Sequence, residues 1–551
     1  MKSTIRYETE VVIIGGGATG TGIMRDCALR GIKCILLERD DLASGTTGRN
    51  HGLLHSGARY AVTDQHSAQE CIKENRILKN IARHCIEDTG GLFVTLPEDD
   101  LDFQKTFVEQ CGKAGIDTET LSPKEALLLE PNTNPALIGA VKVPDGTIDP
   151  FRLCSSNVLD AKEHGARLFN HSRVTSLIRE GDRVLGVNGV NTQTNQTFQV
   201  IAQQVINAAG IWGQQICEYA DLGIKMFPAK GSLLILDYRI NNLVINRCRK
   251  PSDADILVPG DTISLIGTTS EHIDYDKIDD LHVTNAEVDV LLKEGIKLAP
   301  IMQHSRVLRA YAGVRPLVSL SEDSSGRNIS RGIVLLDHEE RDGLKGFTTI
   351  TGGKLMTYRL MAEQATDLIA KKLGNTNPCS THSQPLPGSV ESPKTLRKTA
   401  SIAKPIYESA IYRHGERAEA FLSESPKSQA IVCECEMVTA GEIEYAIKKL
   451  DVQNLVDLRR RTRMGMGPCQ GELCAYRAAS LFKEYSDITG NESALLMKDF
   501  FEERWKGIKP IFWGDALREA ELSYWVYEGL FGCSDIPNDQ STNPSELERE
   551  E

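Results

Sequence analysis

The stretch from Val11 to Gly22, VVIIGGGATGTG, constrains the fold of this chain more than any other. A run of four apolar residues meets a turn that contains Gly15, Gly17 and Gly20, and a segment with helical apolar periodicity follows. A second apolar run then ends at Glu38. A strand, a glycine turn, a helix, a second strand and a terminal acid make up the fingerprint of a dinucleotide-binding βαβ unit. A glycine-rich turn in an ordinary βαβ unit is the alternative.

The residue types in this unit suit a pyrophosphate and a ribose. Glycines let the backbone approach a pyrophosphate closely, and the N-terminus of the following helix offers N–H groups and a positive dipole end. The carboxylate of Glu38 can accept hydrogen bonds from a ribose diol. By itself the unit fits NAD and FAD equally well, because both contain an adenosine pyrophosphate.

Bulk properties exclude several classes of protein. With 551 residues the chain is long enough for three or four structural units. Its net charge of −13 argues against nucleic acid as a partner, because phosphate backbones are bound by concentrated basic surfaces. The N-terminal residues contain no apolar core of a signal peptide, and no stretch approaches the ~18 apolar residues of a membrane span. We therefore expect a cytoplasmic protein with no membrane span of its own.

Residues 40–61, DDLASGTTGRNHGLLHSGARYA, concentrate side chains that can do chemistry. The segment is too rich in Gly, Ser and Thr for a regular helix or strand, yet it includes His55, Arg59 and Tyr60. A loop of this kind, after a dinucleotide fingerprint, can wrap the phosphates of a cofactor with backbone and hydroxyl donors. It can also present polar side chains to the reactive ring of that cofactor.

The fingerprint and this loop carry a family resemblance. The glycine motif with Glu38, followed by TTGRNHGLLHSGARY, resembles the FAD-dependent glycerol-3-phosphate dehydrogenases, which are similar in turn to the D-amino-acid-oxidase-like flavoproteins. The resemblance covers residues 8–372 and implies an α/β fold, with a Rossmann-like FAD-binding domain and an antiparallel-sheet substrate domain. The FAD-binding domain comprises residues of about 8–85, 150–220 and 330–372, and the substrate domain residues of about 86–149 and 221–329.

Two later segments of the FAD-binding domain end in small residues. Strands are expected around Val174 and Val184, and an apolar strand ends in Asn207-Ala208-Ala209-Gly210. Residues 332–361 return to a strand, a glycine turn and a helix, which Thr351-Gly352-Gly353-Lys354 opens. A helix N-terminus and a lysine there favour negative charge on a reduced flavin. Together with the resemblance, these features make the ligand FAD. The residues implied to contact it are Gly15, Gly17, Gly20, Glu38, Thr46, Thr47, Asn50, Val174, Ala209, Gly210, Gly352, Gly353 and Lys354.

The segment from 225 to 320 alternates apolar and polar residues between turns, which indicates a half-exposed antiparallel sheet. In the resembled family such a sheet forms a substrate domain over the flavin. The motif YAGVRPL within it makes Arg315 the main candidate for binding a substrate phosphate. The resemblance implies that Arg59 and Tyr60 complete this phosphate site, and arginine is favoured there by its bidentate geometry.

Four of the fourteen cysteines are grouped near the C-terminus. Residues 373–428 are rich in Pro, Ser, Thr and Asn and are interpreted as a linker, after which come Cys433-Glu434-Cys435 and then Cys469 and Cys474. Alternate residues of an extended segment share a face, so Cys433 and Cys435 can hold one edge of a metal site. Four thiolates suit either a 2Fe–2S cluster or a zinc ion.

Residues 429–483 are similar to bacterioferritin-associated-ferredoxin-like 2Fe–2S domains, although the second cysteine pair of those domains is normally C-x-x-C and here four residues intervene. The resemblance implies a 2Fe–2S cluster, with zinc or an empty site as the alternatives. The basic run RRRTR at 459–463 is interpreted as a solvated or salt-bridged face, with a docking or cluster-tuning surface as the alternative.

The C-terminal tail, residues 484–551, is unusually aromatic between residues 500 and 531. We expect these aromatic residues to pack on their own domain, with contact to a partner subunit or a membrane surface as the alternative. Residues after about 535 lack apolar content and are expected to be disordered.

The two parts together resemble the catalytic subunits of the anaerobic glycerol-3-phosphate dehydrogenases of bacteria. The resemblance implies oxidation of sn-glycerol 3-phosphate to dihydroxyacetone phosphate by hydride transfer to FAD, with His55 as the base and Lys354 as the runner-up. It also implies two partners, a flavin-bearing B subunit with an iron–sulfur C subunit, which hold the complex on the cytoplasmic face of the inner membrane and pass electrons to the quinone pool. The alternatives are an amino-acid or 2-hydroxy-acid dehydrogenase of the same fold and a non-catalytic redox relay.

Overall fold

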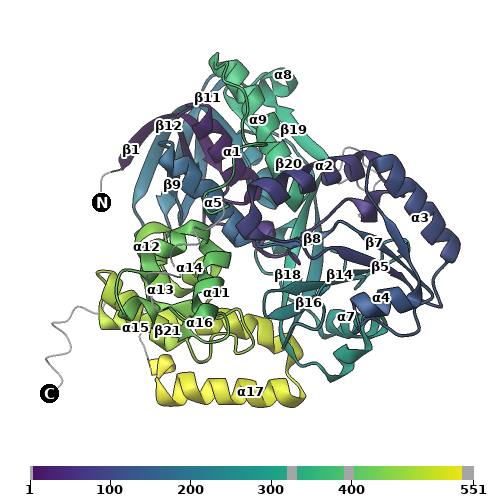
Figure 1. Ribbon diagram of the computed structural model, residues 1–551. Helices are drawn as coiled ribbons and strands as arrows, with labels where there is room; N and C mark the ends of the chain where they lie inside the picture. Colours follow the sequence, from purple (N-terminus) through teal and green to yellow (C-terminus); the bar gives the residue numbers. More distant parts are fainter. Residues whose placement is uncertain (1–3, 319–331, 390–401, 536–551) are drawn as a thin grey trace, which may run out of the picture.

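The computed structural model describes residues 4–318, 332–389 and 402–535. Figure 1 shows two sheets side by side, each with helices packed on it, and a helical C-terminal part that packs against both from below in that view. The disorder expected after residue 535 lies outside the described residues.

The first sheet is built around the N-terminal βαβ unit. Strand β1 (Ile5–Ile14) lies between β2 (Cys34–Leu37) and β12 (Thr197–Asn207) and is parallel to both. The order is β10-β11-β12-β1-β2-β9, with β20 beside the end of β12 and β19 beyond it. The remaining strands are β9 (Arg167–Phe169), β10 (Ser172–Glu180), β11 (Arg183–Asn191), β19 (Ile333–Asp337) and β20 (Phe347–Gly352).

Burial explains the uninterrupted apolar runs of this sheet. The last four residues of β1 and all of β2 are buried, as expected for a parallel sheet that is covered on both faces. One face packs on helices α1 (Ala18–Leu29), α5 (Pro150–Glu163) and α9 (Tyr358–Leu373). Because β1, β12 and β20 are parallel, the turns that follow them meet at one edge of the sheet, where ligands of such folds bind.

The second sheet has nine strands and forms the expected substrate domain. Its order is β17 (Glu271–His272), β13 (Met226–Leu236), β16 (Ile263–Gly267), β15 (Ile256–Gly260), β14 (Val244–Arg247), β5 (Gly91–Thr95), β7 (Gly139–Val143) and β6 (Glu119–Leu121), with β18 (Val307–Val318) paired to β13. Helix α7 (Asn285–Leu298) covers one face, and α2 (Gln65–Ile81) and α3 (Leu101–Ala114) pack on the other.

This sheet differs in two respects from the half-exposed antiparallel sheet that the sequence indicated. Strand β13 is buried at almost every position, because it is a central strand with helix α7 packed against it. Strand β14 runs parallel to β5, although the other pairs in the sheet are antiparallel. These two strands are far apart in the chain, so no hairpin dictates their relative direction.

The C-terminal part consists of helices around a short hairpin. The segment interpreted as a linker contains two helices among its described residues, α11 (Lys404–His414) and α12 (Ala418–Leu422). The hairpin of β21 (Ile431–Cys433) and β22 (Val438–Thr439) leads into α13 (Ala440–Lys449), α14 (Leu455–Thr462), α15 (Ala475–Tyr485), α16 (Gly490–Ile508) and α17 (Gly514–Tyr524). A π-helical turn, Trp525–Leu530, follows α17.

Helix α14 docks this part on the first sheet through ion pairs. The buried guanidinium of Arg461 donates to Asp41, in the loop after β2, at 3.0 Å, and Arg460 reaches the same carboxylate at 3.1 Å. On the same helix, Asp457 accepts from the ring of His171 at 3.0 Å. For Arg460 and Arg461 the basic run is therefore a salt-bridged face, and that face lies at a domain interface.

Candidate functional site

A cavity of about 1490 Å³ lies between the two sheets. Its wall is formed by the residues after β1, β2, β12 and β20 on one side and by β18 on the other. Every residue predicted to bind cofactor or substrate lines it, except Gly20. The volume exceeds the range of about 300–1,000 Å³ that is usual for small-molecule sites, so a dinucleotide and a second ligand both have room.

The glycine turn is shaped by close backbone contacts. Gly15 has φ of +109°, and a Cβ built on it would lie 2.6 Å from the carbonyl oxygen of Ala208. A Cβ on Gly20 would lie 1.9 Å from the carbonyl oxygen of Gly15. Gly20 therefore serves the close packing of α1 on the turn, which explains why it does not reach the cavity.

The N-terminus of α1 faces the cavity. Its N-cap is Gly17, whose lack of a side chain leaves the first turn without a cap of its own. The backbone N–H of Ala18 donates to the hydroxyl of Thr47 at 3.0 Å, and Gly17, Ala18 and Thr47 all line the cavity. A helix N-terminus of this kind suits a phosphate group, because its N–H groups and dipole both favour an anion.

Glu38 is held in place by backbone donors. Its carboxylate accepts from the N–H of Gly16 at 2.6 Å and from the N–H of Asp40 at 2.8 Å. Burial raises the pKa of Glu38 to about 7, although these two hydrogen bonds and Arg39 act to lower it. A ligand hydroxyl that donates to the carboxylate would further favour its ionised form.

Two of the predicted cofactor residues shape the loop with their side chains. The hydroxyl of Thr46 donates to the carbonyl oxygen of Val314 on β18 at 2.6 Å and so joins the loop to the second sheet. The amide of Asn50 donates to the carbonyl oxygen of Thr47 at 2.6 Å and accepts from the N–H of Gly52 at 2.7 Å. Both residues still line the cavity.

The remaining predicted cofactor residues come from strand β10 and from the turns after β12 and β20. Val174 lies on β10 next to a β-bulge, Ala209 and Gly210 follow β12, and Gly352 and Gly353 follow β20. The prediction that residues 351–354 open a helix was wrong in detail. Residue 352 ends the strand, and a 3-10 turn, Leu355–Thr357, precedes α9, because both glycines have positive φ.

A compact group of polar rings lies where this turn meets the loop 40–61. The Nζ of Lys354 lies 4.7 Å from the ring centre of Tyr60, and the rings of Tyr60 and His55 are 5.5 Å apart. The ring of His51 lies 5.9 Å from that of His55, whose residue is only 7% exposed. The structure therefore brings both candidate bases, His55 and Lys354, to the same ring.

The two candidate arginines reach the cavity from different elements. Arg59 donates through Nη2 to Asp255 at 3.0 Å, while its Nη1 is buried without a hydrogen-bond partner among the described residues. Arg315 on β18 donates through Nη2 to the hydroxyl of Thr268 at 2.6 Å and to the carbonyl oxygen of Thr269 at 3.0 Å. A buried, unsatisfied guanidinium nitrogen in a cavity wall suits an anionic ligand.

The sequence reasoning missed several parts of the wall, among them residues 250–253, Thr268, Trp212 and Tyr219 after β12, and Asp279. The stretch KPSD lies between two apolar strands and combines turn residues with a lysine. That composition indicates a surface turn as readily as a binding loop, so only its position in the fold identifies it.

The four cysteines converge as predicted. Hydrogen bonds from Cys435 and Cys474 lower the pKa of Cys433, and the same two thiols lower the pKa of Cys469. The sulfurs thus form a ring in which each contacts two others, as four ligands of one metal site do. Cys433 and Cys474 are buried, whereas Cys435 and Cys469 are partly exposed.

The local explanation for this convergence was wrong. Cys433 ends β21, but Cys435 lies in the turn between β21 and β22, so the two are not alternate residues of one strand. The turn, which includes Met437 with positive φ, curls Cys435 back beside Cys433.

Fold and site together define a class of protein: an oxidoreductase with a dinucleotide cavity between a Rossmann-like domain and a substrate domain, and a four-cysteine metal domain beside it. Residues 10–359 match the profile of the FAD dependent oxidoreductases, and residues 431–484 match that of the BFD-like [2Fe-2S] binding domain. FAD as cofactor is thereby confirmed, and the choice between zinc and a 2Fe–2S cluster is settled in favour of the cluster.

Sequence comparison with individual proteins shows which family within this class the chain resembles. The chain is 64% identical over 533 residues to the A subunit of the anaerobic glycerol-3-phosphate dehydrogenase of Escherichia coli K12, covering 97% of this chain and 98% of that one. It is 42% identical to the corresponding A1 protein of Haloferax volcanii, covering 97% and 92%. The chain belongs to the family of anaerobic glycerol-3-phosphate dehydrogenase A subunits.

A solved structure has the same fold. The glycerol-3-phosphate dehydrogenase of Bacillus halodurans, complexed with FAD, superimposes with a TM-score of 0.67 at 22% identity, over 92% of this chain and 96% of that one. Among the residues that the structure describes, no helix combines the length and the apolar character needed to cross a membrane.

Proposed function

We propose that this chain oxidises sn-glycerol 3-phosphate to dihydroxyacetone phosphate with FAD as the hydride acceptor. One observation carries the proposal: a single cavity joins the dinucleotide-binding turns to two arginines and a His–Tyr–Lys group. The printed names of the relatives point to the same substrate.

The residues around the cavity fit FAD. Gly17 and the N-terminus of α1 would hold the pyrophosphate, and Glu38 the ribose. The turn at Gly352-Gly353-Lys354 would lie at the isoalloxazine ring, where a positive charge favours the reduced form. Bound there, FAD supplies a two-electron acceptor that no side chain can replace.

The substrate phosphate would be held by Arg59, Tyr60 and Arg315. Arg59 supports this role because its buried Nη1 has no protein partner among the described residues. Arg315 supports it because Thr268 and Thr269 hold one side of its guanidinium in the cavity wall. Arg59 and Arg315 come from separate elements, so a phosphate bound by both has a fixed position in the cavity. Phosphate binding would therefore also position C2 of the substrate.

His55 would remove the proton from the C2 hydroxyl as the hydride leaves C2. An imidazole has an ordinary pKa near neutrality, which suits a general base. Lys354 is the alternative base, and its position beside the ring of Tyr60 places it in the same group.

We further propose that two partner subunits complete the enzyme. The relatives are named as A subunits, which implies others. A flavin-bearing B subunit together with an iron–sulfur C subunit would hold this chain at the cytoplasmic face of the inner membrane and deliver its electrons to the quinone pool.

An anaerobic titration tests the proposed reaction. The purified chain with FAD receives an amino acid, then a 2-hydroxy acid, then sn-glycerol 3-phosphate, and finally dithionite, while the flavin absorption is followed. The flavin band should bleach on addition of glycerol 3-phosphate and not before. Bleaching by an amino acid or a 2-hydroxy acid would assign the other substrate class, and bleaching by dithionite alone would leave only a redox relay.

A further inference from the structure

The aromatic segment near the C-terminus has an inner and an outer side. Among the residues that the structure describes, ten of the nineteen exposed large hydrophobic residues fall between residues 473 and 531. They are Leu473, Tyr476, Phe512, Trp513, Leu517, Leu522, Tyr524, Trp525, Leu530 and Phe531. Exposed apolar residues scattered singly need no explanation, but a concentration of this kind marks an interaction site. We call this set the outer aromatic surface.

The inner side packs beneath the cysteine loop. The rings of Phe501 and Tyr527 stack at 4.7 Å, and both residues belong to the core of the C-terminal part. The hydroxyl of Tyr527 donates to the carbonyl oxygen of Gly471, between Cys469 and Cys474, at 3.2 Å. The expectation that the segment packs on its own domain therefore holds for this inner side.

Ring contacts connect the inner side to the outer aromatic surface. Phe531 lies 6.2 Å from Tyr527 and stacks at 5.5 Å on Tyr476, two residues after Cys474. On the other side, Trp505 contacts Phe501 at 5.4 Å and Tyr524 at 6.3 Å. The exposed rings of Tyr476, Tyr524 and Phe531 are thus continuous with the packing around the cysteine loop.

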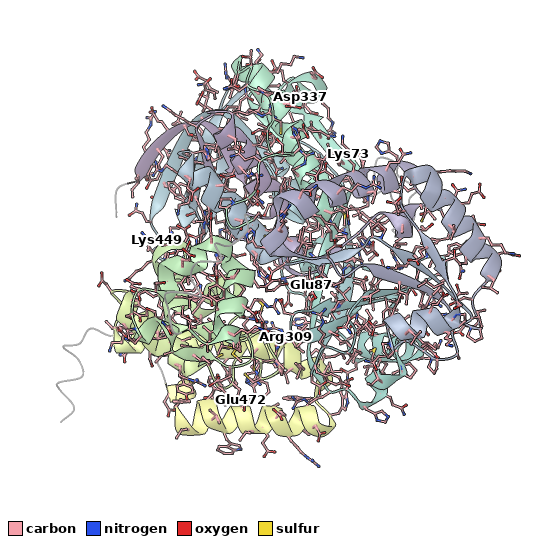
Figure 2. All side chains as sticks on the ribbon, in the orientation of Figure 1. Lys73, Glu87, Arg309, Asp337, Lys449 and Glu472 are labelled. Atoms are coloured by element: carbon pink, nitrogen blue, oxygen red, sulfur yellow. The ribbon has the colours of Figure 1, made fainter. Side chains whose placement is uncertain are left out.

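The cysteine loop itself contributes to this surface. Leu473, directly before Cys474, is 53% exposed, and two of the four cysteines, Cys435 and Cys469, are partly exposed. Glu472, in the cysteine loop, forms a salt bridge with Arg504 of α16 at 3.7 Å, and Figure 2 shows Glu472 beside α17. The edge of the cluster therefore lies at the border of the outer aromatic surface.

The charged residues near the outer aromatic surface favour a protein partner over a membrane. Between residues 473 and 531 the chain has ten carboxylates and seven basic side chains. Residues 513–531, which hold seven of the ten exposed residues, have four carboxylates and one basic side chain, Arg518. Helices that lie on anionic bilayers carry Lys and Arg on their polar face instead. The acidic segment disfavours a membrane, whereas aromatic residues and leucine flanked by charge are usual in interfaces between proteins.

We propose that the outer aromatic surface is the docking site of the protein subunit that accepts electrons from the 2Fe–2S cluster. The proposal rests on the function proposed above. Each glycerol 3-phosphate gives up two electrons, whereas an iron–sulfur cluster passes one at a time. The partner therefore carries a one-electron redox centre near the contact and receives two electrons in succession for each substrate oxidised.

Two equally exposed leucines provide a matched test. Leu530 in the outer aromatic surface and Leu128 on α4 (Pro123–Leu129), in the substrate domain, are each 74% exposed. The chain is co-expressed with the iron–sulfur subunit proposed above, and affinity is measured for the wild type, Leu530→Glu and Leu128→Glu. A charge inserted in the interface should weaken binding of that subunit at least tenfold in Leu530→Glu, while Leu128→Glu binds as the wild type does. Leu517→Glu, on the exposed face of α17, is a second variant.

Control measurements on each variant separate the outcomes. Flavin bleaching by glycerol 3-phosphate and the electron paramagnetic resonance signal of the reduced cluster are recorded for each isolated variant, and both should be unchanged. If the wild type does not bleach, the proposed function fails while the binding result still decides the docking site. Equal binding by all variants would overturn the docking site. The docking site would also be overturned if Leu530→Glu bound the iron–sulfur partner normally but lost self-association. The same holds if it bound that partner normally but no longer sedimented with phosphatidylethanolamine–phosphatidylglycerol vesicles.

Discussion

Arg315 is the residue on which the proposed recognition of the substrate phosphate depends most directly. Its guanidinium is held by Thr268 and Thr269 and lines the cavity. We expect Arg315→Ala to raise KM for glycerol 3-phosphate about tenfold to a hundredfold with a smaller change in kcat, because a charge-assisted hydrogen bond contributes about 1.5–3 kcal/mol. Arg315→Lys should restore part of the affinity but not the bidentate geometry. An unchanged KM in Arg315→Ala would remove this residue from the phosphate site.

Rapid kinetics can show whether His55 or Lys354 is the general base. Loss of a general base typically slows the chemical step about 10²- to 10⁴-fold. We expect His55→Gln to slow flavin reduction in a single turnover by that order, with unchanged FAD content. Lys354→Met should slow it less, because its main effect would be on the stability of the reduced flavin. The opposite ranking would identify Lys354 as the base.

Helix α1 depends on Gly20 for its packing on the glycine turn. A methyl group on Gly20 would meet the carbonyl oxygen of Gly15 at 1.9 Å, so the turn would have to open. We predict that Gly20→Ala abolishes FAD binding, measured as flavin content after purification and as reconstitution with added FAD. Gly31→Ala, at the C-terminal end of the same helix, has open space but positive φ and is the matched control. It should lower stability modestly and retain FAD.

The contact of His171, directly before β10, with Asp457 of α14 should depend on pH. Burial alone would lower the pKa of His171, but its hydrogen bond to Asp457 raises the pKa above the ordinary value of 6.5. A histidine with a raised pKa stabilises the fold below its unfolded pKa, and that stabilisation disappears as pH rises through the folded pKa. We therefore expect the contribution of this pair to Tm, a few degrees, to disappear as pH rises above about 6.5.

The variant His171→Gln isolates this effect. Its Tm should be lower than that of the wild type at pH 6 and should converge with it at higher pH, in thermal unfolding followed by circular dichroism. His304→Gln changes an exposed histidine and serves as the control. Parallel pH curves for the wild type and His171→Gln would exclude this pair as the cause.

Elements whose signals are local could be predicted from the sequence. The βαβ unit follows from an apolar run, Gly15 and Glu38, and the strand ending at Asn207 was placed correctly because small residues follow it directly. The burial of β13 and the pairing of His171 with Asp457 could not be predicted, because they depend on segments that are distant in the chain. The same holds for the wall residues 250–253, which nothing local distinguishes from a surface turn.

At the scale of the whole molecule, the C-terminal cysteine domain is attached to both the FAD-binding domain and the substrate domain. The ion pairs of α14 with Asp41 fix the cysteine domain beside the loop that begins the cofactor site. Arg309, on the strand that carries Arg315, donates to Glu503 of α16 at 3.3 Å, and Figure 2 shows it where the substrate domain meets the C-terminal part. The cluster domain is thus attached to both other domains, so its distance from the flavin is set by the fold.

This arrangement predicts that oxidation of substrate and transfer of electrons can be separated. We expect Cys469→Ser to lose the visible absorption beyond that of flavin and the two irons per chain, since one of four ligands is removed. Flavin bleaching by glycerol 3-phosphate should remain, because no cysteine of the cluster lines the cavity. Electron transfer to membrane quinone should fall to background, measured anaerobically in the assembled complex.

Cys379→Ser is the matched control, because this partly exposed cysteine lies outside the cluster and should change none of the three readouts. If Cys469→Ser still reduced quinone at the rate of the wild type, electrons would leave the flavin by another route. The docking surface beside the cluster would then serve assembly alone. If instead Cys469→Ser lost flavin bleaching as well, the cluster domain would be needed to keep the cavity in shape, through the ion pairs that α14 makes with Asp41.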